Sequence, residues 1–351
     1  MVFLYILLAI LAFGLLIFLH ELGHYLSARA FGVAIKEFSI GMGPRLFGYR
    51  SEKTGIDYKL CLLPIGGYVA MVGEDEESDD PNALNKKPAW QRLIIMAAGG
   101  VTNLLLGFLL VLLTVALISS SLATTTVDRF PEYEDGRVAS SYNEGLRAGD
   151  VILKVDGRRV RIGAELDYEI MRRGIEPVTL EIERDGEILI LPDFCFRTYV
   201  DEASNQTLGG RDFYLTVEDG SLGDVLRHAF VRSVMTVRMV WESIYDLVTG
   251  RFGVEAVSGP VGVAGVMVET AKTGIINFLY LVAVISLNLG VVNLFPLPAL
   301  DGGRIFFLAI AAVIRRPIPE KVEGIIHLAG LFLLLAFMLL ITGKDILQLI
   351  F

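Results

Sequence analysis

Long runs without charged residues set the first limit on what this chain can fold into. Residues 93–118 and 275–300 each form a run of 26 positions without Asp, Glu, Lys or Arg. A helix needs about 20 apolar residues to cross a bilayer, so both runs can span one with some tilt. Residues 2–19 and 325–343 are also apolar, and hydrophobic residues make up 53% of the 351-residue sequence. These features predict a polytopic α-helical membrane protein with four transmembrane helices.

The first apolar run leads directly into the pentapeptide His20-Glu21-Leu22-Gly23-His24. Residues four apart lie on one face of a helix, so the two imidazoles can reach the same metal ion. This pattern is typical of zinc enzymes in which the Glu is the general base for a water that the metal activates. Ionisable groups at membrane depth are costly and are functional candidates for that reason. The pentapeptide alone is also compatible with a polar helix end beyond the membrane.

A catalytic zinc ion takes three protein ligands and keeps one open position. The run 275–300 contains Pro296 and Pro298 and ends at Asp301-Gly302-Gly303. Prolines inside a span predict a broken helix, which is tolerated where the freed backbone faces protein or a water-filled cavity. Asp301 is therefore the candidate third ligand beside the two histidines. The alternative is that Asp301 caps the helix that follows it.

The distribution of positive charge places these two parts of the sequence at the same depth. Residues 25–92 carry nine Lys or Arg and residues 301–324 carry four, whereas the chain before Glu21 carries none. The positive-inside rule then puts both connections in the cytoplasm and both termini outside, together with the long segment between the second and third spans. His20 and Asp301 both fall toward the cytoplasmic ends of their spans, as one shared site requires.

Residues 33–73 have the composition of strands. The segment 41–44 (Gly-Met-Gly-Pro) predicts a turn, and 56–58 and 60–63 predict short strands. A hairpin beside a membrane site could pair its edge with an extended peptide, or it could be a plain connection.

The segment from about residue 125 to 220 is polar enough to be soluble. Its run Gly145-Leu146-x-x-Gly149-Asp150 is followed by residues that predict a strand, an Asp-Gly turn and a second strand. Further along, the sequence predicts a helix at 163–173 and strands at 178–182 and 187–191. This run resembles a bacterial PDZ domain, a module that takes up extended peptides by strand addition. An amphipathic helix should follow at 221–249, with Ser221 as its cap, and it either lies on the membrane surface or packs on the soluble domain.

The sequence also argues against nucleic-acid binding, a disulfide bridge and several further metal ligands. The net charge of −9 and the absence of a basic block give no support to nucleic-acid binding. Cys61 and Cys195 are the only cysteines, and the predicted orientation puts them on opposite sides of the membrane, which excludes a bridge. We expect His228 and His327 to be packed or interfacial rather than ligands, and Asn103 to stabilise a helix contact.

Taken together, the motifs resemble the site-2 protease family of intramembrane zinc metalloproteases, of the bacterial RseP type, here with a single PDZ domain. The resemblance covers essentially the whole chain. The matching residues are His20-Glu21-x-x-His24, Gly41-x-Gly43-Pro44, Pro64-x-Gly66-Gly67-Tyr68-Val69, the PDZ-like run, Ser258-Gly259-Pro260-Val261 and Asn288…Asn293-x-x-Pro296-x-Pro298-x-x-Asp301-Gly302-Gly303. Gly99-Gly100 departs from the Gly-Pro that is usual in the family, which should affect the packing of the second span and not the metal site.

The resemblance implies the roles of individual residues. His20, His24 and Asp301 would bind Zn²⁺, and Glu21 would be the catalytic base. The substrate would be bound by the following residues: Asn293 near the metal, with Asn288 assisting, and a hairpin within residues 36–70 that contains Gly41 and Gly43.

The resemblance also implies a cellular location and a function. The protein would be a multi-pass protein of the bacterial cell membrane, with both termini and the PDZ domain extracytoplasmic and the active site toward the cytoplasm. It would cut single-span membrane proteins, bound as extended strands, in regulated intramembrane proteolysis of anti-sigma factors or remnant signal peptides.

We expect the chain to divide into consecutive segments that follow this scheme. They are 1–32 (first span with the zinc motif), 33–92 (cytoplasmic-side loop with a membrane-reentrant β-hairpin), 93–120 (second span), 125–200 (an inserted α+β PDZ domain), 201–257 (β segment and amphipathic helix), 258–315 (third-span region) and 324–345 (fourth span).

Two other functions are compatible with parts of the sequence. A membrane-anchored PDZ scaffold with a structural metal site would capture peptides without cutting them, but an intact Glu21 and an intact third ligand argue against it. A soluble-type metalloprotease tethered by its first helix fails because the only good third ligand, Asp301, lies at the end of a membrane span.

Overall fold

The structure is a computed structural model that describes residues 2–74, 76, 78–132, 137–201, 206–250, 257–316 and 318–350. The chain forms two compact units. One consists of Met1–Leu110 with Met239–Phe351, and the other of Val111–Arg238.

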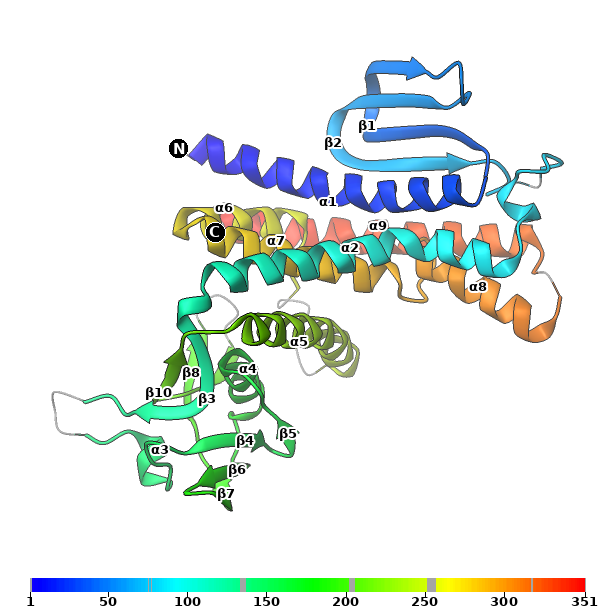
Figure 1. Cartoon of the computed structure of the whole chain (residues 1–351). Coiled ribbons are helices and arrows are strands. Elements are labelled where there is room, and N and C mark those ends of the chain that lie inside the picture. The colour runs from blue at the N-terminus through cyan, green and yellow to red at the C-terminus, as the bar shows by residue number, and fades with distance from the viewer. Residues whose placement is uncertain are drawn as a thin grey trace. The chain divides into compact units, whose positions relative to one another are not determined.

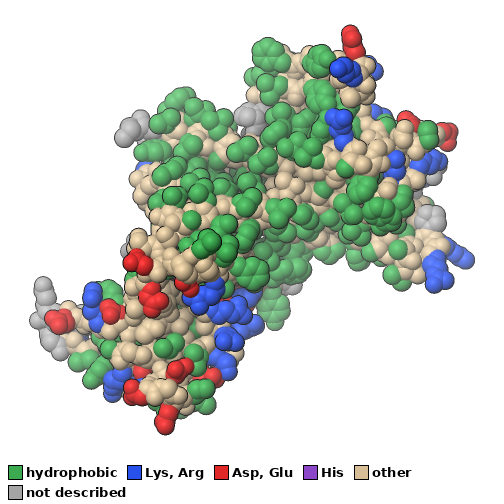
Figure 2. All heavy atoms as spheres, viewed as in Figure 1, with side chains coloured by type: hydrophobic (Ala, Val, Ile, Leu, Met, Phe, Trp, Pro, Cys, Tyr) green, Lys and Arg blue, Asp and Glu red, His purple; other side chains and the backbone are tan. Residues whose placement is uncertain are grey.

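The first unit is built from long apolar helices that run alongside one another (Figure 1). They are α1 (Val2–Ala30), α2 (Ala89–Leu117), α6 (Pro260–Thr273), α7 (Ile275–Asn293), α8 (Asp301–Ile314) and α9 (Glu320–Ile350). Stretches of α1, α2, α7 and α9 are long and apolar enough to cross a membrane, which agrees with the four predicted spans. Hydrophobic side chains cover much of the outer surface of these helices (Figure 2), as expected for surfaces that face lipid.

A cluster of buried side chains joins the N-terminal helix to α6 and α7. Leu16 of α1, Met267 of α6 and Phe278 of α7 lie in this cluster and are at most 3% exposed. A second cluster packs the C-terminal part of α1 against the strands through Tyr25 and Phe38. The two clusters fix the helix that carries the zinc motif at both of its ends.

The helix break predicted in the run 275–300 is present. Helix α7 ends at Asn293, the next residues are turns and bends, and α8 begins at Asp301. A second break, at Gly274 with φ 132°, separates α6 from α7. The third-span region predicted at 258–315 included the residues of α6. In the structure α6 is a separate helix, because Gly274 adopts a backbone conformation that a helix cannot continue through.

The strands of the first unit form a strongly bent hairpin. β1 (Ile35–Arg50) and β2 (Asp57–Met71) are each continuous in the structure. The strands predicted at 56–58 and 60–63 are largely confirmed, since 57–63 lies within β2, whereas the predicted turn at 41–44 does not interrupt β1. The reason is that Gly41 and Gly43 adopt positive φ values of 82° and 88° inside the strand, so the chain bends there without ending the ladder.

The bend gives the hairpin an unusual pairing. Residues 35–40 of β1 pair with 67–71 of β2 along one side. Residues 37–40 also pair with 57–60 along the other side, and 47–50 pairs with 57–60 as well. Within the described residues, one edge of the strand segment 67–71 pairs with β1, and its other edge has no partner in this ladder.

The second unit is a mixed α+β fold. Its sheet has the order β10-β3-β4-β6-β7, with β5 paired to β4. Its remaining strands, β8 and β9, form a separate pair. The elements are β3 (Leu122–Arg129), α3 (Ser140–Asn143), β4 (Val151–Val155), β5 (Arg158–Arg159), α4 (Gly163–Arg173), β6 (Val178–Arg184), β7 (Glu187–Phe194), β8 (Arg197–Asp201), β9 (Gln206–Gly210) and β10 (Tyr214–Glu218).

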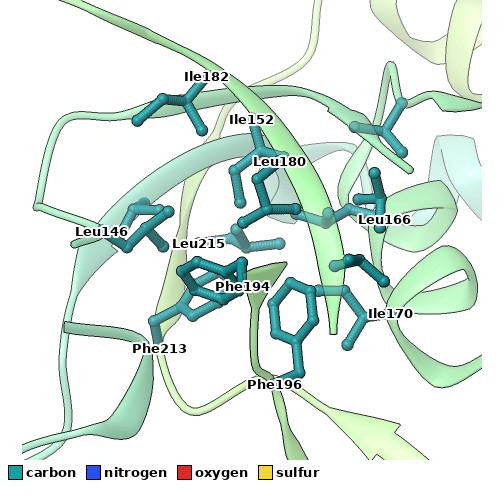
Figure 3. Close-up of a cluster of buried hydrophobic side chains, with 14 residues drawn as sticks. Leu146, Ile152, Leu166, Ile170, Leu180, Ile182, Phe194, Phe196, Phe213 and Leu215 are labelled. Carbon is teal, nitrogen blue, oxygen red and sulfur yellow. The ribbon is translucent and has the colours of Figure 1, made fainter. Parts of the chain in front are cut away.

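The predicted helix and strands between residues 163 and 191 are present as α4, β6 and β7. The sheet nevertheless extends beyond the predicted boundary at residue 200, because β10 pairs with β3 from the other end of the unit. Leu146, Ile152, Leu166 and Leu180 lie fully buried in its core (Figure 3). A pairing between segments about 90 residues apart leaves no local signal in a sequence.

Helix α5 (Leu222–Thr249) begins as predicted. The backbone N–H of Asp224 donates to Ser221 Oγ (3.3 Å), and the backbone N–H of Ser221 donates to Asp224 Oδ2 (3.1 Å). This reciprocal pair is a capping box. The apolar side chains of this helix are divided between two environments, because Ala229 is fully buried whereas Phe230 is 61% exposed.

Candidate metal centre

The helical spacing of the zinc motif brings its two imidazoles together. His20 and His24 lie one turn apart on α1, and their Nε2 atoms are 3.3 Å apart. Both residues are buried, at 8% and 7% exposure.

Asp301 completes the cluster from the other end of the chain. Its Oδ2 atom lies 3.2 Å from Nε2 of His20 and 3.2 Å from Nε2 of His24. The N-cap of α8 is Leu300, and Asp301 is the first helical residue. The side chain of Asp301 therefore faces the histidines from the first turn of α8, a placement that the capping alternative does not explain.

The donor set has the size that a zinc ion requires. Bonds of about 2.0–2.1 Å in a tetrahedral arrangement place neighbouring ligand atoms about 3.3 Å apart. The three donor atoms form a triangle with edges of 3.2–3.3 Å. Among the described residues, this is the group of His, Cys, Asp or Glu side chains that could hold a metal ion. Two imidazoles and one carboxylate also match the ligand chemistry of catalytic zinc sites.

Helix α2 orients both imidazoles. The Nδ1 atom of His24 lies 2.8 Å from the backbone oxygen of Ile95, so His24 donates from Nδ1 and keeps Nε2 free to bind a metal. The Nδ2 atom of Asn103 lies 3.4 Å from Nδ1 of His20, and its Oδ1 atom has no partner in the described structure. If the amide is flipped, Oδ1 faces the ring and accepts from Nδ1–H. Such outer contacts fix the tautomer and direction of a ligand histidine.

Two glycines allow α2 to come this close. A Cβ atom on Gly23 would lie 2.6 Å from the backbone oxygen of Ala98, and one on Gly99 would lie 2.3 Å from Nε2 of His24. Gly99 thus leaves the space beside the imidazoles open. Gly100 faces α7 instead, where a Cβ would lie 2.7 Å from Cγ of Leu294. The departure from Gly-Pro therefore concerns helix packing, as the sequence analysis expected.

The cluster opens into a cavity of about 150 Å³. The lining consists of His20, Glu21, His24, Tyr68, Val69, Met71, Glu74, Met96, Asp301 and Arg304. Glu21 and the edge segment of β2 thus share the cavity with the metal ligands. At its wall Arg304 donates to Glu74 over 2.8 Å.

The hairpin lies directly against Glu21. A Cβ atom on Gly67 would lie 3.2 Å from Cγ of Glu21, so the absence of a side chain at Gly67 lets the backbone of β2 pass close to the side chain of Glu21. The cavity therefore places the Glu21 carboxylate and room for water beside the cluster, next to a strand edge that lies outside the β1–β2 ladder.

The other predicted site residues do not line this cavity. Asn288 and Asn293 are half-exposed on α7, outside the lining given above. Gly41 and Gly43 mark the bend of β1. His228 and His327 are not in the metal cluster, in keeping with the sequence analysis.

Asn103 makes a contact with His20 that was not predicted from the sequence. Its backbone oxygen accepts from Ser286 Oγ over 2.8 Å, which joins α2 to α7, but the amide, which was expected to stabilise a helix contact, faces His20 instead. A useful signal is available in the sequence: a lone amide in a charge-free span requires a polar partner.

Comparisons with known proteins agree with this geometry. The model of Peptidase family M50 matches residues 8–337. A protein of Clostridium perfringens that carries an inferred zinc metalloprotease name is 34% identical, over 97% of this chain and 98% of its own length. The Zinc metalloprotease RasP of Geobacillus kaustophilus is 29% identical over 96% of each chain. The Regulator of sigma-W protease RasP of Bacillus subtilis is 28% identical, over 96% of this chain and 97% of its own length.

Proposed function

Because this chain belongs to peptidase family M50 and is a zinc metalloprotease of the membrane, we propose that it cleaves single-span membrane proteins within the bilayer. His20, His24 and Asp301 would hold the zinc ion, and Glu21 would be the catalytic base. The observation that carries the proposal is the triangle of donor atoms, with edges of 3.2–3.3 Å, formed by residues at the ends of two apolar helical segments.

The chemistry follows from the groups in the cavity. Zinc, when bound, supplies Lewis acidity that polarises the scissile carbonyl and makes a water nucleophilic near neutral pH. The carboxylate of Glu21 takes the proton of the attacking water and delivers it to the nitrogen of the leaving amine. The backbone oxygen of Ile95 accepts from Nδ1–H of His24. Asn103, with Oδ1 turned toward the ring, would accept from Nδ1–H of His20 in the same way, which leaves both Nε2 atoms free to bind the metal.

A membrane helix has to be opened before its backbone can be cut. In hydrocarbon, each freed N–H and C=O group needs a partner. The segment 67–71 lines the metal cavity with Tyr68, Val69 and Met71 and has a second edge outside the β1–β2 ladder. We infer that the unwound substrate pairs with this edge as an extended strand, which satisfies its backbone groups as it approaches the metal.

Further substrate contacts are proposed on α7 and on the hairpin. Asn293 and Asn288 follow one another on α7, and Asn293 is its last residue. Their amides would bind the backbone of the opened substrate, with Asn293 the nearer to the metal. The bend at Gly41 and Gly43 would shape the hairpin that receives the strand.

The second unit would regulate access. Its sheet places β10 at one edge, beside β3, and an edge strand is what a PDZ domain offers to an extended peptide. The Bacillus subtilis relative is named for control of a sigma factor. We propose regulated intramembrane proteolysis of anti-sigma factors or remnant signal peptides as the task. The charge distribution supports an extracytoplasmic position for this unit and both termini, with the active site toward the cytoplasm.

The decisive experiment replaces the base and leaves the metal site intact. Purified Glu21→Gln protein in detergent should retain zinc by elemental analysis and lose cleavage of a single-span model substrate. Glu187→Gln, a change at an exposed carboxylate of β7, is the matched control and should cleave normally. Wild-type turnover by the Glu21→Gln protein would refute the role of Glu21.

A further inference from the structure

The turn that carries Asp301 into the metal cluster contains a residue in an unfavourable conformation. Ala299 has a φ of 73°, in the left-handed region where a Cβ atom approaches the following carbonyl. Non-glycine residues persist there only when surrounding contacts hold them. Ala299 is two residues before Asp301, so whatever holds Ala299 also sets where the carboxylate lies.

The contact that holds Ala299 comes from α9. The backbone N–H of Ala299 donates to Nδ1 of His327 over 2.9 Å. This bond requires the neutral imidazole with its proton on Nε2, because only an unprotonated Nδ1 can accept. His327 is itself confined: its ring centroid lies 5.5 Å from that of Phe307, and its Nε2 lies 3.8 Å from a carboxylate oxygen of Glu323.

Close backbone contacts surround this hydrogen bond. A Cβ atom on Gly330 would lie 2.3 Å from Cβ of Pro298, and one on Gly303 would lie 3.1 Å from Cε1 of His327. Helix α9 and the start of α8 therefore enclose the turn on both sides. Within this enclosure, the bond to His327 is the directional contact to the strained residue.

We propose that His327 is a positioning residue for the metal centre: it fixes Ala299 in its left-handed conformation and thereby places the Asp301 carboxylate against His20 and His24. The inference rests on the proposed role of Asp301 as a ligand. His327 does not touch the metal cluster and acts through the turn.

The test uses two substitutions that move the hydrogen-bond acceptor. In His327→Asn the amide oxygen can take the place of Nδ1, whereas in His327→Gln the acceptor lies one bond further out, near the place of Nε2. Zinc affinity is measured on purified full-length protein by competition with a chelator. His327→Ala and His327→Gln should lower the affinity about 10–100-fold, the range typical of lost outer contacts, and His327→Asn should stay within about threefold of wild type on the same scale.

A second substitution separates positioning from general packing. Glycine adopts a positive φ without strain, so Ala299→Gly combined with His327→Ala should recover most of the lost zinc affinity. Leu328→Ala, which alters the neighbouring exposed side chain of α9, is the control and should bind zinc as wild type does.

Each outcome decides the matter. Recovery by Asn and by Ala299→Gly supports the proposal. Wild-type affinity in His327→Ala, equal affinity in the Asn and Gln proteins, or no recovery with Ala299→Gly would overturn it. If His327→Ala does not fold in detergent, the Asn and Gln pair decides alone. Asp301→Ala is measured in parallel: unchanged zinc there refutes the ligand role itself, whereas lost zinc there with normal zinc in His327→Ala refutes only the role of His327.

Discussion

The metal cluster has two halves that are built in different ways. His20 and His24 lie on one turn of an uninterrupted helix, and regular i, i+4 geometry brings their Nε2 atoms to 3.3 Å. Asp301 reaches the same place through a broken span, a strained Ala299 and close backbone contacts. The first half depends on backbone regularity and the second on tertiary contacts. The two halves should therefore differ in which substitutions they tolerate.

The largest expected effect is the loss of a ligand from the second half. Asp301→Ala leaves two imidazoles, which is one ligand short of a catalytic zinc site. We expect zinc content after dialysis to fall to a trace and cleavage to be lost. Elemental analysis and a cleavage assay on the purified protein check this, with Asp219→Ala, a change in the second unit, as the control. Normal zinc content in Asp301→Ala would leave the cluster without its proposed third ligand.

The next effect concerns the backbone contacts of the same half. A Cβ atom on Gly302 would lie 2.0 Å from the backbone oxygen of Phe295, and backbone cannot move aside as a flexible side chain can. Gly302→Ala should therefore displace Asp301 and reduce zinc affinity at least about tenfold, the lower end expected for a misplaced ligand. Gly343→Ala, where a Cβ would meet nothing within 4 Å, is the matched control. Equal zinc affinity in both proteins would show that the turn is not tightly packed.

The contrast between the halves also explains what could be read from the sequence. The histidine pair is a local pattern, and its geometry follows from helical spacing alone. Asp301 could be proposed because charge counting placed it at the depth of His20, but its role as a ligand remains a prediction. The strained Ala299, the contact of Asn103 with His20 and the continuous bent strands were not foreseen. Each depends on segments distant in sequence or on a backbone angle that only the folded environment selects.

A smaller effect is expected where a helix supports the first half. Asn103→Ala removes the amide beside Nδ1 of His20 and should lower zinc affinity about 10-fold, within the range for outer contacts of ligand histidines. Asn277→Ala, at an exposed amide near the start of α7, is the control and should change nothing. Chelator competition measures both. An unchanged affinity in Asn103→Ala would show that α1 alone fixes the direction of His20.

The smallest effect should come from a polar contact within α1 itself. Ser27 Oγ donates to the backbone oxygen of His24 over 3.0 Å, a local bond that adds to the helical hydrogen bonding of the same backbone. In Ser27→Ala that oxygen keeps its helical partner, so no buried group is left unsatisfied. We expect zinc affinity to change less than about twofold, since a local bond of this kind contributes little. A loss as large as that expected for Gly302→Ala would contradict the contrast between the halves, because it would show that the helical half also depends on individual side-chain contacts.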